Sequence, residues 1–112
     1  MIGYLNEKEN DTVNKIKYML SERLADNLRE VVLFGSKARG DYGVESDIDI
    51  IIVVKDLNID CFHTISKVID DVELDTGLSF SVCPYEADEF YKQLANSANP
   101  LMQGVKMEGI AV

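Results

Sequence analysis

The sequence predicts one small α/β domain of the α+β type, built on a mixed or antiparallel sheet with helices packed mainly on one side. Its 112 residues are enough for one hydrophobic core, so a single domain is expected over residues 1–112. Two apolar runs, at residues 30–34 and 48–54, have the length and composition of strands. About a dozen residues separate these runs. This is little for a full crossover helix, so an antiparallel or mixed sheet follows.

Helices are expected in four segments. Residues 7–28 place apolar side chains at spacings of three and four, which is the pattern of an amphipathic helix packed on a sheet. Residues 59–72 repeat this pattern, and residues 86–95 are expected to form a shorter helix. A last helix is expected over residues 100–107, because Pro100 is a residue type favoured in the first helical turn.

Four strands are expected between and after these helices. Residues 30–34 are nearly all apolar, as in a strand that is covered on both faces, and residues 48–54 form the second strand. Residues 78–83 alternate between apolar and polar side chains, which predicts a third strand that Pro84 ends. The last three residues, 110–112, are apolar and are expected to add a short final strand.

The overall charge and composition limit the classes of partner. The formal net charge of −9 argues against a nucleic-acid polymer as the main partner, because phosphate binding needs a basic surface. The same charge is compatible with a basic protein partner. No apolar run is long enough to cross a membrane, and the first residues lack the features of a signal peptide. The cytoplasm is therefore expected, and with it free thiols at Cys61 and Cys83.

The most informative segment is residues 34–49, where a Gly-Ser pair and two aspartates stand at the ends of two predicted strands. Gly35 and Ser36 follow the first apolar run, and Asp47 and Asp49 open the second. Because side chains alternate along a strand, the two carboxylates are expected to point to the same side. Neighbouring carboxylates repel each other without a cation, and hard oxygen ligands suit Mg²⁺. The aspartate pair is therefore predicted to bind this metal.

The Gly-Ser turn is predicted to bind phosphate. Gly35 has no side chain to obstruct a triphosphate, and Ser36 offers its hydroxyl and its backbone N–H. Lys37 either steers phosphates or is a solvated lysine, and Arg39 either pairs with a phosphate or holds the loop through an ion pair. Ser46 either caps the second strand or orients the aspartate that follows it. A metal site beside a phosphate-binding turn indicates a site that handles nucleotides.

The pattern Gly-Ser, ten residues, Asp-x-Asp resembles the nucleotidyltransferase domain of the DNA polymerase beta superfamily, and more closely the minimal nucleotidyltransferases of prokaryotes. The specific motif covers residues 34–49, and the size and layout are similar over nearly the whole chain. The resemblance implies the small α/β core of that family and transfer of a nucleotide from a nucleoside triphosphate, with ATP as donor. Asp47 and Asp49 would be the catalytic residues, holding one or two Mg²⁺ ions against the phosphates.

The chain departs from the superfamily pattern at a third carboxylate. Active members usually carry this acid on the strand equivalent to residues 78–83, whose polar side here presents two serines and a cysteine. Glu73 and Asp75 precede this strand and Glu45 lies in the loop, so each is a candidate substitute. The other alternative is a site with two carboxylates only, with weaker metal binding and with catalysis that is slow or depends on a partner.

The size of the chain leaves no room for a second module that binds an acceptor, so the acceptor is expected on another chain. This fits a resemblance to antitoxins encoded beside HEPN-type ribonuclease toxins, which transfer AMP from ATP to a toxin tyrosine. Two alternatives stay open: a degenerate domain that neutralises its partner by binding, and transfer to a small molecule such as an aminoglycoside. The base preference, the number of AMP units and self-association into a homo-oligomer are also open.

Overall fold

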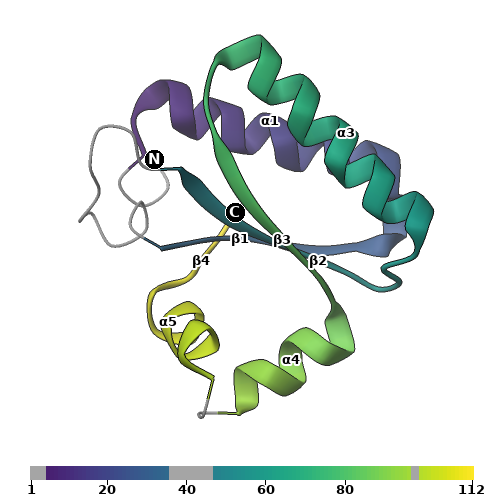
Figure 1. Cartoon of the computed structure of the whole chain (residues 1–112), viewed down its shortest axis with the longest axis vertical. Coiled ribbons are helices and arrows are strands. Elements are labelled where there is room, and N and C mark those ends of the chain that lie inside the picture. Colours follow the sequence, from purple (N-terminus) through teal and green to yellow (C-terminus); the bar gives the residue numbers. More distant parts are fainter. Residues whose placement is uncertain (1–4, 36–46, 97–98) are drawn as a thin grey trace.

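The computed structural model describes residues 5–35, 47–96 and 99–112, which form a four-stranded mixed sheet between two layers of helices (Figure 1). The strand order is β3-β2-β1-β4. β1 pairs antiparallel with β2 and with β4, whereas β2 pairs parallel with β3. The predicted mixed sheet is therefore confirmed. The strands are β1 (Leu28–Phe34), β2 (Ile48–Val54), β3 (Phe80–Glu86) and β4 (Ile110–Ala111).

The two long helices, α1 (Glu7–Leu24) and α3 (Ile59–Thr76), cover one face of the sheet (Figure 1). This face holds the larger hydrophobic core, so the helices lie mainly on one side, as predicted. The shorter α4 (Ala87–Ala95) and α5 (Pro100–Glu108) pack a smaller core against part of the opposite face. Of the helices described, none is long and apolar enough to cross a lipid bilayer.

β2 contributes fully buried side chains to both cores. Ile50 and Ile52 belong to the core under α1 and α3, whereas Ile51 and Val53 belong to the core beside α4 and α5. All four side chains are fully buried, which explains why β2 reads as a continuous apolar run rather than an alternating one. Each such burial contributes roughly 1.5–3 kcal/mol. β2 is therefore firmly held, and so are the residues at its start.

α1 ends at Leu24, not at residue 28 as the sequence predicted. A 3₁₀ turn, η1 (Ala25–Asn27), follows, and Leu28 already begins β1. Ala25 has a φ of 48°, a left-handed value that interrupts the helix. The apolar periodicity continued to Leu28 because this leucine packs against the same core from the strand. A helix and the strand that follows it can thus share one apparent helical pattern.

α3 extends to Thr76, beyond the predicted end at residue 72. Asn58 caps its N-terminus by accepting a hydrogen bond from the backbone N–H of Cys61 at 2.8 Å. At the C-terminus Gly77 adopts a φ of 75°, and its N–H donates to the carbonyl of Glu73 at 2.9 Å. The last helical turn is largely polar, so the apolar pattern ended before the helix did.

β3 passes through Pro84, although the sequence analysis expected this residue to end the strand. The carbonyl of Ser79 points toward β2 and accepts from the N–H of Ile48 at 3.0 Å. The N–H of Phe80 points the other way, to a carboxylate of α3. Alternation puts the nitrogen of Pro84 on the same outer edge, where a missing N–H costs no hydrogen bond to β2. The strand therefore continues to its last residue, two positions beyond the proline.

Proline should be tolerated on the outer edge of β3 and rejected one residue earlier. The N–H of Cys83 points toward β2, so Cys83→Pro removes a hydrogen bond between strands and leaves a carbonyl of β2 without its donor. We expect Cys83→Pro to lower the free energy of unfolding by about 1–3 kcal/mol more than Cys83→Ala, in urea titrations followed by circular dichroism. Pro84→Ala should be close to neutral. Equal losses for the two Cys83 variants would contradict this orientation of β3.

Candidate active site

The described residues of the Gly-Ser and Asp-x-Asp segments meet at one end of the sheet. β1 ends at Phe34, and Gly35 follows directly. β2 begins at Ile48, which lies between Asp47 and Asp49. In the antiparallel register, Phe34 pairs with Asp49. The hydrogen-bonded pairing of β1 with β2 therefore sets the end of one segment beside the start of the other.

Gly35 and Asp49 are in direct contact. Gly35 has a φ of 75°, a conformation that glycine adopts far more readily than other residues. A Cβ atom placed on Gly35 would lie 2.3 Å from Oδ2 of Asp49 and 3.0 Å from its Cγ. No side chain fits in that space, because such distances are well inside van der Waals contact. Glycine is thus required here for its backbone angle and also for the position of the Asp49 carboxylate.

The two aspartates differ in exposure. Asp49 is partly buried, and Asp47 is exposed just before the strand begins. Ile48, between them, is buried in the core under α1 and α3, so Asp49 points to the opposite face of β2. Strand alternation puts Asp47 on the same side as Asp49. This places one carboxylate at the surface and one deeper on the same face of β2.

The electrostatic effect of Asp49 reaches β3. Burial raises the pKa of the Cys83 thiol above its ordinary value, and the negative charge of Asp49 raises it further. The ordinary pKa of cysteine already lies above neutral pH, so the thiol of Cys83 stays protonated at pH 7. A protonated thiol is a poor nucleophile and a poor metal ligand. The two carboxylates, and not this cysteine, are therefore the groups suited to chemistry at this end of the sheet.

Ser81 occupies the place beside Asp49 on the neighbouring strand. The parallel register pairs Asp49 with Ser81, at the position where the superfamily pattern leads one to expect a third acid. Across residues 5–35, 47–96 and 99–112, no three side chains of His, Cys, Asp or Glu gather closely enough to hold a metal ion. Glu45, one candidate substitute, lies outside the described residues.

The other two candidate substitutes make contacts elsewhere. Oε2 of Glu73 accepts a hydrogen bond from the backbone N–H of Phe80 at 2.8 Å, so this side chain holds the start of β3 against α3. Asp75 forms an ion pair with Lys15 of α1 at 3.2 Å, with the side chains of both residues more than half exposed. Neither carboxylate is directed to Asp49 by these contacts. The described residues therefore offer two carboxylates at the site.

Two carboxylates are sufficient to fit Mg²⁺ when a nucleotide is present. Mg²⁺ is commonly held by one or two protein carboxylates together with phosphate oxygens of the substrate and water molecules. Asp47 and Asp49 supply the carboxylates, and the bare backbone at Gly35 allows phosphates to approach closely. The remaining residues assigned to phosphate binding or to support lie outside the described residues, and their roles stay predictions. They are Ser36, Lys37, Arg39 and Ser46.

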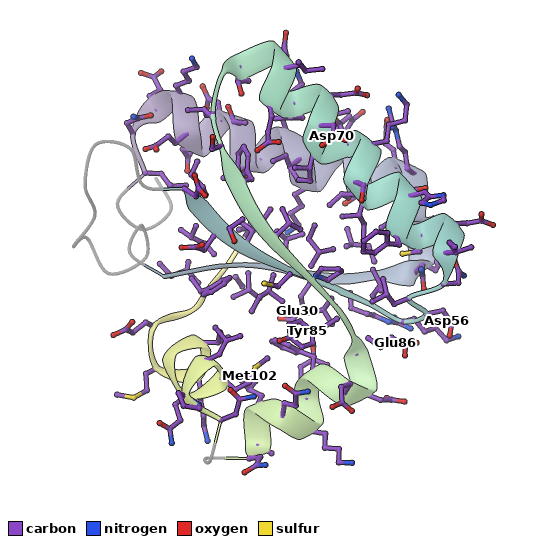
Figure 2. The ribbon with its side chains drawn as sticks, viewed as in Figure 1. Glu30, Asp56, Asp70, Tyr85, Glu86 and Met102 are labelled. Carbon is purple, nitrogen blue, oxygen red and sulfur yellow. The ribbon has the colours of Figure 1, made fainter. Side chains whose placement is uncertain are left out.

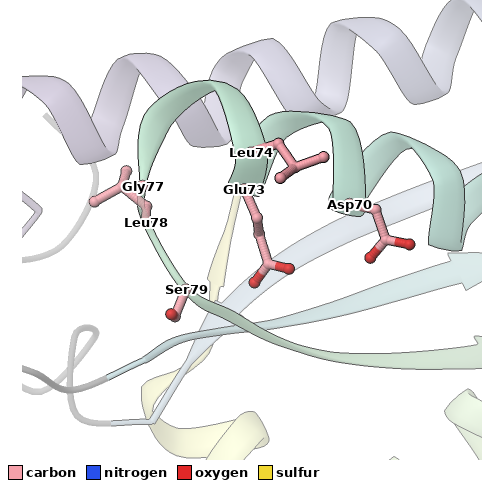
Figure 3. Close-up of a pocket in the computed structure, with 6 residues that line it drawn as sticks. All are labelled: Asp70, Glu73, Leu74, Gly77, Leu78 and Ser79. Atoms are coloured by element: carbon pink, nitrogen blue, oxygen red, sulfur yellow. The ribbon is translucent and has the colours of Figure 1, made fainter.

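A hollow of about 520 Å³ lies next to this end of the sheet, at the turn from α3 to β3 (Figure 3). The sequence analysis missed it, because its walls come from a helix and a strand whose contact depends on tertiary packing. Only Glu73 and Ser79 of its lining had been considered, and for a different reason. The lining residues are Asp70, Glu73, Leu74, Gly77, Leu78 and Ser79.

Most of the chain matches a known family in sequence. Residues 13–101 match the family model described as "Nucleotidyltransferase domain". A candidate protein adenylyltransferase of Methanocaldococcus jannaschii is 47% identical over 47 residues, which make up 42% of this chain and 48% of that protein. The match thus spans about half the length of this relative.

The fold is similar to chains in two solved toxin–antitoxin structures. One is a toxin–antitoxin crystal structure with AMP-PNP, with 19% identity, a TM-score of 0.58, and coverage of 95% of this chain and 72% of that chain. The other is a complex of the tri-AMPylated HEPN toxin of Shewanella oneidensis with an MNT antitoxin. It shows 19% identity, a TM-score of 0.54, and coverage of 91% of this chain and 69% of that chain. At this level of identity the likeness concerns the fold.

Gly35→Ala and Gly77→Ala form a matched pair of variants, because both glycines have a φ of 75° but a Cβ on Gly77 would meet nothing within 4 Å. We expect Gly77→Ala to lower the free energy of unfolding by about 1–2 kcal/mol, from left-handed strain alone. Gly35→Ala adds displacement of Asp49 to the same strain. It should therefore also weaken binding of Mg²⁺–ATP at least tenfold in calorimetric titrations, which corresponds to about 1.4 kcal/mol. Equal nucleotide affinity in the two variants would show that the contact with Asp49 is unimportant.

Ser81→Asp should install a third carboxylate beside Asp49. Without Mg²⁺ the new charge should lower the thermal midpoint, because like charges repel at short range. With Mg²⁺–ATP the affinity should rise about tenfold, equivalent to about 1.4 kcal/mol. Ser81→Asn is the control, since it has nearly the same size and no charge. A response to Mg²⁺ that is the same in the aspartate and asparagine variants would argue against a metal site next to Ser81.

Proposed function

Since this chain belongs to the nucleotidyltransferase domain family, we propose that it transfers AMP from Mg²⁺-bound ATP to a hydroxyl group of a partner protein. The observation that carries this proposal is the contact of the Asp49 carboxylate with the bare backbone of Gly35. A carboxylate in that position faces whatever ligand the Gly-Ser turn binds.

The residues of the site then have distinct roles. Asp47 and Asp49 hold the Mg²⁺, which when bound neutralises phosphate charge and makes the α-phosphorus more electrophilic. Ser36 binds the β- and γ-phosphates through its hydroxyl and N–H, and Lys37 and Arg39 add positive charge near them. The acceptor hydroxyl gives up its proton to solvent as its oxygen forms a bond to the α-phosphorus, and the bond between that phosphorus and the oxygen bridging to the β-phosphorus breaks. Pyrophosphate leaves, and AMP remains on the acceptor.

The acceptor is proposed to be a HEPN-type toxin, with this chain as its antitoxin. Support comes from the structural neighbours, one of which pairs an MNT antitoxin with an AMPylated HEPN toxin. The relative from Methanocaldococcus jannaschii is named for transfer of adenylyl groups to proteins. The formal net charge of −9 favours a basic protein partner over a nucleic acid. A tyrosine of the toxin would be the modified residue.

A second candidate function is neutralisation of the partner by binding alone. Ser81 at the position beside Asp49 favours this alternative, because a missing third acid lowers the affinity of the site for metal. In that case the chain would keep the fold of the family and its partner surface, with little or no transfer of AMP. The two functions differ in whether the partner gains mass.

Intact mass spectrometry of the proposed HEPN-type partner protein separates the two functions. After incubation with ATP and Mg²⁺ we expect the toxin to gain one or more AMP units. Asp47→Asn and Asp49→Asn should each reduce the rate by more than about 100-fold, since loss of residues that merely support a metal ligand already costs about 10–100-fold.

Asp56→Asn is the control for these variants. Asp56 lies beyond the other end of β2 and is exposed, so its loss should leave the rate unchanged (Figure 2). A stable complex in which the toxin keeps its original mass would instead favour neutralisation by binding.

A further inference from the structure

A groove runs along the outer edge of the sheet, between α3 and β3. It consists of the hollow of about 520 Å³ beside Ser79 and a second hollow of about 230 Å³ that reaches Pro84. Asp70 and Glu73 line both hollows, so the two adjoin. Figure 3 shows these two side chains in the larger hollow. We refer to this feature as the α3–β3 groove. One of its ends therefore lies at the candidate active site.

The floor of the groove is apolar and partly open to solvent. Ile65 and Ile69 of α3 are buried beneath it, while Phe80 and Val82 of β3 are only partly covered. Phe62, at the end far from the active site, keeps 49% of its surface exposed. An exposed aromatic ring over a partly covered apolar floor is typical of a surface that another protein covers.

The backbone at this edge offers more acceptors than donors, because strand alternation leaves one outward N–H, that of Val82, between Phe80 and Pro84. The N–H of Phe80 already donates to Glu73, and Pro84 has no N–H. The carbonyl groups of Phe80 and Pro84 point outward with them. These two features protect the edge against addition of a further β-strand, which needs alternating donors and acceptors. An occupant of the groove must therefore bind mainly through its side chains.

The side chains around the groove also offer mainly hydrogen-bond acceptors. Asp70 and Glu73 supply carboxylates, which only accept hydrogen bonds when ionised, and Ser66 supplies the one hydroxyl of the smaller hollow. Of the described residues that line the groove, none is a lysine, arginine or histidine. Hydrogen-bond acceptors above an apolar floor favour a ligand that combines many hydrogen-bond donors, a positive charge and an apolar stem. Arginine and lysine side chains have this combination.

We propose that the α3–β3 groove receives a segment of the partner protein that carries arginine or lysine between apolar side chains. This inference rests on the proposed function and names the surface through which the partner docks. The carbonyl of Ser79, at the end of the groove, accepts from the N–H of Ile48, between the two site aspartates. A segment seated in the groove therefore reaches the end of the sheet at which AMP transfer is proposed, on the side of β3 that faces α3, while Asp47 and Asp49 lie on the opposite face of β2.

A second copy of this chain does not suit the groove. The chain has 20 acidic and 11 basic residues, and a copy would present the same carboxylates at the same place. Like charges across an interface cost several kcal/mol, so self-association through this face is opposed. A basic partner gains from the same charges, both in the rate of encounter and in orientation.

Asp70→Lys and Asp71→Lys test the groove as a matched pair. The two residues are adjacent and exposed on α3, and each substitution changes the net charge by the same amount, but only Asp70 lines the groove. Asp71 is paired with Lys67 at 3.6 Å on the helix surface. We expect Asp70→Lys to weaken binding of the HEPN protein more than tenfold in calorimetry, and Asp71→Lys less than twofold. Phe62→Ser should weaken it as Asp70→Lys does.

The proposed function and the groove can fail separately. Thermal melts and titration with Mg²⁺–ATP should be unchanged in both lysine variants, which shows that the fold and the nucleotide site are intact. If the native chain transfers AMP but Asp70→Lys binds the partner as tightly as Asp71→Lys, the groove is not the docking surface, and the proposed function stands. If Asp70→Lys selectively loses the partner while the native chain transfers no AMP, the function is wrong and the groove stands. If the native chain forms no complex with the HEPN protein, the assignment of the groove as a docking surface is overturned.

Discussion

β2 has an antiparallel neighbour on one side and a parallel neighbour on the other, and the site depends on this placement. The pairing with β1 puts Phe34 next to Asp49, and the pairing with β3 puts Ser81 on its other side. Three segments that are distant in sequence thus share one row at one end of the sheet. Burial of β2 in two cores holds this row in position, so the ligand does not have to pay for ordering it.

The contact of Asp49 with Gly35 leaves no space for a side chain on residue 35. The carboxylate occupies the space where any other residue would carry its Cβ, so the acid and the glycine act as one unit. Its charge reaches Cys83, whose pKa is raised by burial and then by Asp49, and keeps that thiol protonated. With Ser81 rather than an acid beside it, metal affinity depends more strongly on the phosphates of the nucleotide. Metal and nucleotide are then expected to bind together.

The proposed partner surface and the nucleotide site use different chemical features of one sheet. At the end of the sheet, bare backbone and two carboxylates suit a metal–phosphate ligand. Along the outer edge of β3, carbonyl groups and the acids of α3 suit a donor-rich side chain. Asp70 lies on α3 above this edge, well away from Asp56, Glu86 and the far end of the sheet (Figure 2). Asp47 and Asp49 lie on the face of β2 opposite α3, so partner affinity and nucleotide chemistry can be altered independently.

The sequence alone was sufficient for the features that depend on local spacing. It predicted a mixed or antiparallel sheet, the bounds of β2 at residues 48–54, and the family, because each is encoded by periodicity or by a motif within a short segment. The assignments of the motif residues outside the described part of the chain, Ser36 among them, remain predictions. Tertiary structure decided what depends on partners far along the chain. α1 stops before Leu28 because that leucine reaches the same core from a strand, and Pro84 stays within β3 because its nitrogen faces outward. Glu73 and Asp75, both candidates by sequence, are directed to Phe80 and to Lys15 by packing. The α3–β3 groove likewise exists only once helix and strand are packed together, since no local pattern specifies which backbone edge of a strand will face the solvent.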